Sequence, residues 1–135
     1  MILITGACGF IASALTWELN RCGKNDIILC GELEKEEKWL NIRDRDYYDW
    51  VNKDDLFEWL SVEENAKKIT GVVHMGACSA TTETDMDFLM DNNYGYTKKL
   101  WKFCSEKDIN FIYASSAATY GIGELGYDDD VTPEE

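Results

Sequence analysis

The chain has 135 residues, which fits one domain, and 45% of them are hydrophobic, which excludes a disordered polypeptide. Its formal net charge of −13 excludes the broad basic surface with which proteins bind nucleic acid or anionic membranes. Five cysteines without a C-x-x-C pair argue against a zinc site or a disulfide framework, and no stretch is apolar enough to span a membrane, so we expect reduced thiols in a cytoplasmic chain.

The first thirty residues predict a β-α-β unit. Residues 1–5 are a run of branched apolar side chains that Gly6 ends, as is typical of a buried strand in a parallel sheet. Residues 10–22 follow a helical period and end before Gly23, and residues 26–30 form a second apolar strand. The face of this helix that we expect against the sheet consists of Ile11, Leu15, Leu19 and Cys22.

The rest of the chain continues the alternation of strands and helices. We expect a loop at 34–38, a short strand within 39–46, a helix at 53–60 and a strand at 69–74. A long helix is predicted from an N-cap at Thr82 to about residue 107, with Tyr96, Leu100 and Phe103 facing the sheet, and a strand follows at 110–114. This order predicts an α/β fold, a Rossmann-like doubly wound parallel sheet that occupies residues 1–135.

A glycine loop joins the first strand to the first helix. Gly6, Gly9 and Ala12 form the pattern G-x-x-G-x-x-A. Gly6 permits a tight turn, Gly9 lets a pyrophosphate approach the backbone at the start of the helix, and Ala12 permits close packing of helix and sheet. Because the pattern lies within the first β-α-β unit, it predicts a dinucleotide site.

The end of the second strand bears on the kind of dinucleotide. Gly31 and Glu32 stand where such sites hold the adenosine ribose, and Glu32 suits the ribose hydroxyls of NAD. Lys38 and Lys53 suit the 2′-phosphate of NADP instead, or are ordinary surface charges.

Residues 74–79 (HMGACS) directly follow the strand at 69–74. Gly76 and Ala77 leave room for a ligand against the backbone. We expect the single histidine, His74, to be a buried and hydrogen-bonded imidazole more than a catalytic base, and Cys78 to be a packing residue more than a nucleophile. Asparagines 92 and 93 are poor residues for a helix interior, which indicates hydrogen bonds to a neighbouring loop or a cofactor, or else chance exposure.

Residues 113–121 (YASSAATYG) place two serine hydroxyls at the carboxyl end of the last predicted strand. Ligands and chemistry sit at this end of open α/β sheets. Together with 6–13, 74–83 (HMGACSATTE) and 90–94 (MDNNY), this segment resembles the extended short-chain dehydrogenase/reductase family of nucleotide-sugar epimerases and dehydratases. The similarity is closer to the branch that acts on ADP-linked heptoses than to the UDP-sugar epimerases.

The resemblance implies NADP as cofactor, with NAD possible, and a nucleotide-sugar substrate. The implied reaction inverts C6″ of ADP-glyceromanno-heptose by transient oxidation and re-reduction, in lipopolysaccharide core biosynthesis. Carried over by residue, Ser116 is the active-site serine. The cofactor contacts carried over are Phe10, Ile11, Lys38, Lys53, Met75, Gly76, Ala77, Cys78, Ser79 and Asn92. The glycine loop and the end of the second strand add Gly6, Gly9, Gly31 and Glu32 to the expected cofactor site.

This sequence departs from the family pattern at a few positions. Ala12 replaces a third glycine, Gly31-Glu32 replaces an Asp-Asn pair, and Met75 replaces an acid, so the choice between NAD and NADP stays open. The family's catalytic Tyr-x-x-x-Lys segment and its C-terminal substrate domain are expected after residue 135, so we expect these residues alone not to epimerise. The alternatives are a non-catalytic nucleotide-binding module that self-associates through an exposed sheet edge into a homo-oligomer, or part of a UDP-sugar epimerase or dehydratase.

Overall fold

The computed structural model describes residues 1–33, 37–124, 126 and 127, and its centre is a parallel sheet of five strands in the order β3-β2-β1-β4-β5. The strands are β1 (Ile2–Thr5), β2 (Ile27–Gly31), β3 (Asp49–Asn52), β4 (Gly71–His74) and β5 (Asn110–Tyr113). Each neighbouring pair is parallel and in continuous register. The predicted doubly wound parallel sheet is confirmed, as are four of its strands, with β2 extended through Gly31.

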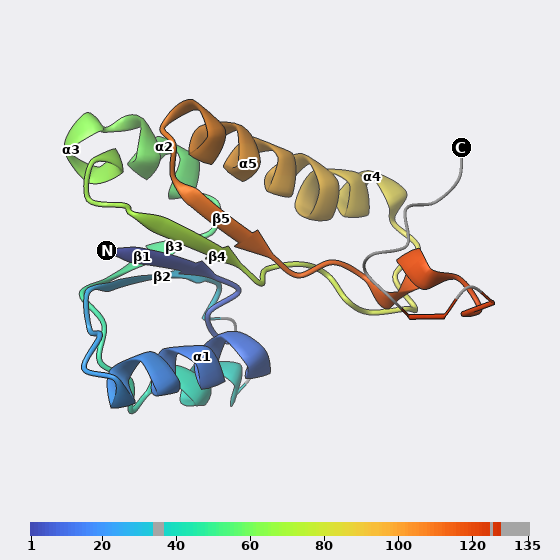
Figure 1. Ribbon diagram of the computed structural model, residues 1–135, viewed down its shortest axis with the longest axis horizontal. Coiled ribbons are helices and arrows are strands. Elements are labelled where there is room, and N and C mark those ends of the chain that lie inside the picture. The colour runs from blue at the N-terminus through green and yellow to red at the C-terminus, as the bar shows by residue number, and fades with distance from the viewer. Residues whose placement is uncertain (34–36, 125, 128–135) are drawn as a thin grey trace.

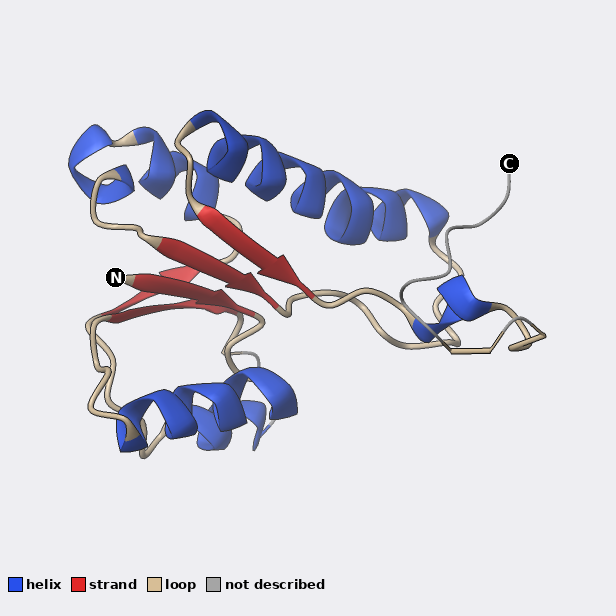
Figure 2. Cartoon of the chain, viewed as in Figure 1, coloured by secondary structure: helices blue, strands red, loops and turns tan. Residues whose placement is uncertain are grey.

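Helices cover both faces of the sheet (Figure 1; Figure 2). One face carries α1 (Phe10–Arg21) and the 3-10 helix η1 (Glu37–Ile42), and the other carries α2 (Leu56–Ser61), α3 (Glu63–Ala66), α4 (Met86–Leu89) and α5 (Tyr96–Glu106). Because side chains alternate along each strand, β1 contributes to both layers. Leu3 packs with Leu56 and Leu100, whereas Ile4 packs with Ala12 on the side of α1.

The third strand lies at Asp49–Asn52, so the strand predicted within residues 39–46 is wrong. Those residues form η1 and the turn after it, and only Ile42 among the apolar side chains of η1 is buried. Two hydrogen bonds hold the segment to α1 and the loop before it. Asn41 Nδ2 donates to the Cys8 carbonyl at 2.9 Å, and Arg45 Nε donates to the Ser13 carbonyl at 3.2 Å. Of the loop predicted at 34–38, residues 34–36 lie outside the described residues and the last two begin η1.

Helix α1 begins at the predicted residue and ends one residue early, and half of its predicted inner face is confirmed. Gly23, with φ +72°, follows its end as expected. Leu15 and Leu19 pack against the core cluster as predicted, whereas Ile11 and Cys22 are exposed. Ala12 and Thr16 are fully buried instead. Small side chains let the helix approach the sheet closely, and this close packing outweighs the apolar period.

The long helix over the other face begins at Met86 and not after Thr82. Asp85 is its N-cap, since its carboxylate accepts a hydrogen bond from the Phe88 N–H at 3.0 Å. The helix is interrupted by a π-helical turn, η2 (Met90–Gly95), and it ends at Lys107 as predicted. The predicted inner face is confirmed, since Leu100 is fully buried and Tyr96 and Phe103 pack against the same core cluster. On the same face, α2 begins at Leu56 and not at 53, and α3 was not predicted.

β5 lies at one edge of the described sheet. Its side chains Ile112 and Tyr113 are 62% and 53% exposed, so the expected exposed edge is confirmed, whereas self-association through it stays a prediction. Among the described residues, no helix combines the length and the apolar character that a membrane crossing requires.

Candidate functional site

The candidate site lies at the carboxyl ends of β1 and β4. The strand order reverses between these two neighbours, because β2 and β3 extend to one side of β1 and β4 and β5 to the other. Ligands of open α/β sheets bind in the crevice outside such a switch point. Two loops leave the sheet here, residues 6–9 after β1 and residues 75–79 after β4 (Figure 1).

The two loops pack backbone against backbone through glycines. Gly6 has φ +65°, and a Cβ added to it would lie 2.7 Å from the Gly76 nitrogen. A Cβ added to Gly76 would lie 3.1 Å from the Gly6 nitrogen. The Gly9 N–H donates to the Gly6 carbonyl at 2.8 Å and closes the turn. Gly6 is therefore required by the turn, and Gly6 and Gly76 are both required by the close approach of the two loops.

The amino end of α1 opens onto this crevice. Its cap residue, Gly9, has no side chain to bond the first-turn N–H groups, and the first turn contains no acidic residue. Phe10 and Ile11 are 83% and 61% exposed, so the backbone around them is open to a ligand. Unpaired N–H groups and the positive end of the helix dipole favour an anionic group such as a pyrophosphate.

The carboxyl end of β2 closes the crevice on the side of the glycine loop. A Cβ added to Gly31 would lie 3.3 Å from the Trp50 ring and 3.4 Å from the Ala7 nitrogen. The Ala7 N–H donates to the Cys30 carbonyl at 3.1 Å, which joins the loop to β2. A side chain at Gly31 would therefore press on the Trp50 ring and on the backbone of the glycine loop, so glycine here lets the loop lie close to β2.

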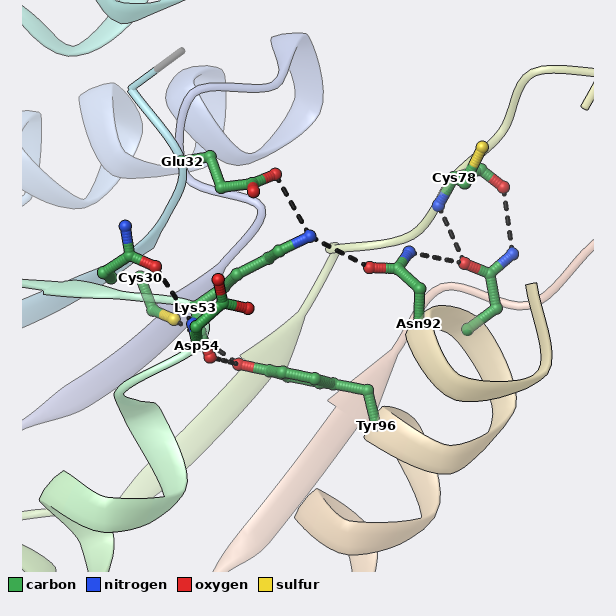
Figure 3. A network of polar contacts seen from close by, with 9 residues as sticks. Cys30, Glu32, Lys53, Asp54, Cys78, Asn92 and Tyr96 are labelled. Carbon is green, nitrogen blue, oxygen red and sulfur yellow. Dashed lines mark hydrogen bonds and ion pairs between the residues drawn. The ribbon is translucent and has the colours of Figure 1, made fainter. Parts of the chain in front are cut away.

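Lys53 bridges two sides of the crevice (Figure 3). Its Nζ lies 3.2 Å from Glu32 Oε2 and 3.3 Å from Asn92 Oδ1. The sequence left open whether Lys53 was an ordinary surface charge. Its side chain is only 26% exposed and joins the end of β2 to the π-helical turn, so it is not an ordinary surface charge, whereas its contact with a cofactor stays a prediction. Lys38, the other candidate lysine, lies exposed on η1.

Tyr96 fixes the backbone of Lys53. Its hydroxyl donates to the Lys53 carbonyl at 3.0 Å, and Cys30 Sγ lies 3.7 Å from the hydroxyl oxygen of Tyr96 (Figure 3). Burial raises the pKa of the Cys30 thiol to about 12 and raises the pKa of Tyr96 well above its ordinary range. Both groups therefore stay neutral at physiological pH and act as structural partners.

Asn93 holds the loop after β4, and the sequence analysis did not identify Cys78 as its partner. Its Oδ1 accepts the Cys78 N–H at 2.8 Å and its Nδ2 donates to the Cys78 carbonyl at 3.0 Å. Asn92 Nδ2 donates in turn to Asn93 Oδ1 at 2.9 Å. The expectation that the paired asparagines bond a neighbouring loop is confirmed, whereas contact of Asn92 with a cofactor stays a prediction.

His74 is a buried, fully bonded imidazole, as expected. It is 4% exposed, its Nδ1 lies 2.6 Å from Thr5 Oγ1, and its Nε2 lies 2.8 Å from Thr97 Oγ1. Burial lowers the pKa of the imidazole to about 4, because the charged form loses its hydration. At neutral pH it is therefore uncharged and hydrogen-bonded on both nitrogens.

Other predicted residues line the loop after β4 or lie beyond it. Met75 is partly buried against the cluster under α1, and Ala77 and Ser79 are exposed. Ser116 lies exposed after β5, where its Oγ accepts the Ala118 N–H at 3.2 Å and caps the 3-10 helix η3 (Ala117–Tyr120). Because that oxygen accepts in this contact, its own proton is free to be donated to a ligand.

Sequence reasoning also overlooked a Tyr-x-x-x-Lys sequence within the chain, at Tyr94 and Lys98. Lys98 Nζ donates to the Tyr94 hydroxyl at 3.4 Å and lies 5.4 Å from the centre of its ring. Tyr94 is 57% exposed. The spacing places both side chains on one helical face, and they make an ordinary surface contact there.

Comparison with known proteins agrees with this geometry. The sequence profile of the NAD dependent epimerase/dehydratase family matches residues 2–134. The chain is 67% identical over its full length to ADP-L-glycero-D-manno-heptose-6-epimerase of Fusobacterium nucleatum and 48% identical over 132 residues to the enzyme of that name in Nitratidesulfovibrio vulgaris. It covers 41% of the length of each of these relatives.

Solved structures show the same fold. A UDP-glucuronic acid 4-epimerase of Bacillus cereus, in complex with UDP-glucuronic acid and NAD, matches 98% of this chain and 45% of its own at a TM-score of 0.78 and 26% identity. The heptose epimerase of Helicobacter pylori matches 89% of this chain and 40% of its own at a TM-score of 0.70 and 22% identity. The Rossmann-like fold is thus confirmed, and the chain belongs to the NAD dependent epimerase/dehydratase family.

Proposed function

We propose that this chain binds a nicotinamide dinucleotide in the crevice between β1 and β4. The observation that carries the proposal is the backbone contact of the loops at Gly6 and Gly76, beside a helix whose first turn has neither a capping side chain nor an acid. Such a helix end accepts a pyrophosphate, and a side chain at either glycine would push the two loops apart. The family description and the NAD held by the B. cereus relative support the choice of ligand.

The residues of the crevice fall into three groups along such a ligand. The backbone of Gly9, Phe10 and Ile11 faces the pyrophosphate, and Gly31, Glu32 and Lys53 lie at the adenosine end. The loop of residues 75–79, with Asn92 beside it, lies at the other end. When bound, the nicotinamide supplies a reversible hydride acceptor.

We further propose NADP as the preferred cofactor. Lys53 Nζ is only partly shielded, and with Lys38 it supplies the positive charge that a 2′-phosphate needs. One observation favours NAD as the second candidate: the Glu32 carboxylate lies 3.2 Å from Lys53, where it would repel a phosphate and accept hydrogen bonds from ribose hydroxyls.

Titration of the intrinsic tryptophan fluorescence with NADP⁺ and with NAD⁺ tests both proposals. Saturable binding of one of them at micromolar concentration is expected, and no binding of either at millimolar concentration would refute the dinucleotide site. Lys53→Ala should weaken NADP⁺ about tenfold and NAD⁺ less, because a charge-assisted hydrogen bond is lost. Glu32→Gln should strengthen NADP⁺, and an unchanged ratio of the two affinities in both variants would contradict the assignment.

For the whole protein we propose epimerisation at C6″ of ADP-glyceromanno-heptose, by transient oxidation and re-reduction, in lipopolysaccharide core biosynthesis. The identity of 67% to the F. nucleatum epimerase supports this substrate. In this reaction the Ser116 hydroxyl would donate a hydrogen bond to the reacting oxygen.

We place the acid/base Tyr-x-x-x-Lys pair and the substrate domain outside residues 1–135. The chain covers 41% of the relative, and the Tyr94–Lys98 pair is exposed on the outer surface of its helix. Residues 1–135 alone should therefore bind cofactor without converting the heptose substrate. Chromatographic detection of the epimer after incubation with the nucleotide sugar and cofactor would contradict this.

A further inference from the structure

His74 lies in the middle of a row of hydrogen bonds that runs from the backbone of Gly76 to the backbone of Asn93. The backbone groups at the two ends of this row determine the direction of each bond. Thr97 Oγ1 lies 2.6 Å from the Asn93 carbonyl oxygen, which can only accept, so the Thr97 hydroxyl donates its one proton there. The same oxygen lies 2.8 Å from His74 Nε2. It can only accept from that nitrogen, so Nε2 carries a proton.

The other ring nitrogen is therefore the acceptor. Burial keeps the imidazole uncharged at neutral pH, so with Nε2 protonated Nδ1 has no proton. Thr5 Oγ1, at 2.6 Å, must donate to Nδ1, and its oxygen accepts the Gly76 N–H at 3.2 Å. Proton donation thus runs one way from the backbone of Gly76 through Thr5, His74 and Thr97 to the backbone of Asn93.

This hydrogen-bond chain reaches both ends of the loop after β4. At one end it holds the Gly76 N–H through Thr5. At the other end Asn93, whose carbonyl receives the last bond, holds the N–H and the carbonyl of Cys78 with its side chain. The π-helical turn that contains Asn93 therefore connects to the loop both directly and through His74.

The surroundings of the imidazole leave it no alternative partner among the described residues. The Tyr96 ring stacks on it at a centroid distance of 5.8 Å and the Phe111 ring at 6.2 Å. Tyr96 is the titratable group that faces it, and its hydroxyl is committed to the Lys53 carbonyl and stays neutral. Thr5 and Thr97 supply the hydrogen bonds from β1 and α5.

We propose that this one-way hydrogen-bond chain sets the position of residues 75–79, which makes His74, Thr97 and Asn93 positioning residues of the crevice. The expected effect on dinucleotide affinity rests on the proposed function, whereas the geometry of the hydrogen-bond chain does not. Loss of the Thr97 hydroxyl should loosen the Gly76 end of the loop, because His74 loses the acceptor that fixes its protonated nitrogen. It should loosen the Cys78 end as well, because the carbonyl of Asn93 loses its donor. Thr97→Ser keeps that hydroxyl and should restore the chain.

A matched control exists in α1. Thr16 is buried, and its hydroxyl donates to the Ala12 carbonyl four residues earlier at 2.9 Å, as Thr97 donates to Asn93. Thr16 makes no contact with His74 among the interactions described. Thr16→Val and Thr97→Val therefore lose the same bond within a helix, and only the second loses the histidine contact.

The experiment uses nitrogen NMR of the single histidine, amide hydrogen exchange, and titration with NADP⁺ and NAD⁺. The wild type should show Nε2–H, and Thr97→Val should speed exchange at Gly76 and Cys78 and weaken dinucleotide binding about tenfold, as expected for one lost hydrogen bond. Thr97→Ser and Thr16→Val should retain the wild-type affinity and exchange at these two amides.

An Nδ1–H tautomer in the wild type, or unchanged exchange at both amides in Thr97→Val, would overturn the inference. If the wild type binds neither dinucleotide, the proposed function fails while the tautomer and exchange measurements still decide the geometry. Should Thr97→Val not fold, the wild-type tautomer decides it.

Discussion

Acidification from about pH 7.5 to about pH 5 should destabilise the fold by about 2 kcal/mol through His74 alone. The pKa of its imidazole is about 4 in the folded chain against 6.5 for an unperturbed histidine. Between these values the unfolded chain binds more protons than the folded one, so stability is fully present above about pH 6.5 and is lost as the pH falls toward 4. At pH 5, RT times the logarithm of the ratio of the proton-binding polynomials of the unfolded and folded chains gives a loss of about 2 kcal/mol in the free energy of unfolding.

Urea unfolding at a series of pH values measures this effect in the wild type and in His74→Gln. Glutamine keeps one acceptor and one donor but does not titrate, so subtracting its curve removes the contribution of the 26 acidic residues. Because the chain has one histidine, the difference belongs to His74. The difference between the two free energies of unfolding should shrink by about 2 kcal/mol toward pH 5. Parallel curves would show that the imidazole is not held neutral by burial.

Three substitutions, two of them with a matched control variant, test the packing of the crevice and the sheet edge. Gly6→Ala should lower the free energy of unfolding by about 3 kcal/mol or more, since its Cβ would lie 2.7 Å from backbone, whereas Gly23→Ala, with positive φ but nothing within 4 Å, should lower it by about 1 kcal/mol. Tyr96→Phe should lower it by about 1 kcal/mol through the lost hydroxyl bond, and Tyr94→Phe, at the surface, should leave it nearly unchanged. Ile112→Lys should change stability by less than about 0.5 kcal/mol and should reduce self-association in sedimentation velocity, because a charged side chain discourages edge pairing.

The outcomes that contradict these expectations differ. Equal losses in Gly6→Ala and Gly23→Ala would show that the two loops are not in backbone contact. Equal stability of the Tyr96→Phe and Tyr94→Phe variants would remove the role of the buried hydroxyl. A wild type that stays monomeric at high concentration would refute self-association through β5.

The strands that the sequence predicted correctly contain continuous runs of apolar residues. β1 and β2 are buried almost throughout, and a glycine ends each run. β3 gives no such signal, because Val51 is its one buried residue and both ends of the strand, Asp49 and Asn52, are exposed and polar. It becomes a strand through pairing with β2, while the more apolar residues 39–42 pack as a short helix. Tertiary pairing therefore outweighed local pattern here.

The candidate site was predictable where chemistry depends on backbone shape. Gly6 and Gly76 could be recognised because a turn and a close approach leave no alternative residue. Asn93 could be suspected from its poor fit in a helix but not assigned, because its partner Cys78 lies 15 residues away on a loop. The π-helical turn, which presents Asn92 and Asn93 together, follows from no periodicity in the sequence.

The net charge of the chain bears on how an anionic ligand is held. A formal charge of −13 repels a dinucleotide at long range, so steering by the field of the whole molecule cannot assist binding. Attraction must come from groups in contact with the ligand, because salt screens electrostatic attraction least at such short distances. The acid-free first turn of α1 supplies dipoles at that range, and Lys53 supplies a charge that Asn92 and Glu32 hold in place. In the proposed dinucleotide site, recognition of the phosphates would therefore depend on the geometry of the two loops, which the contact between Gly6 and Gly76 fixes.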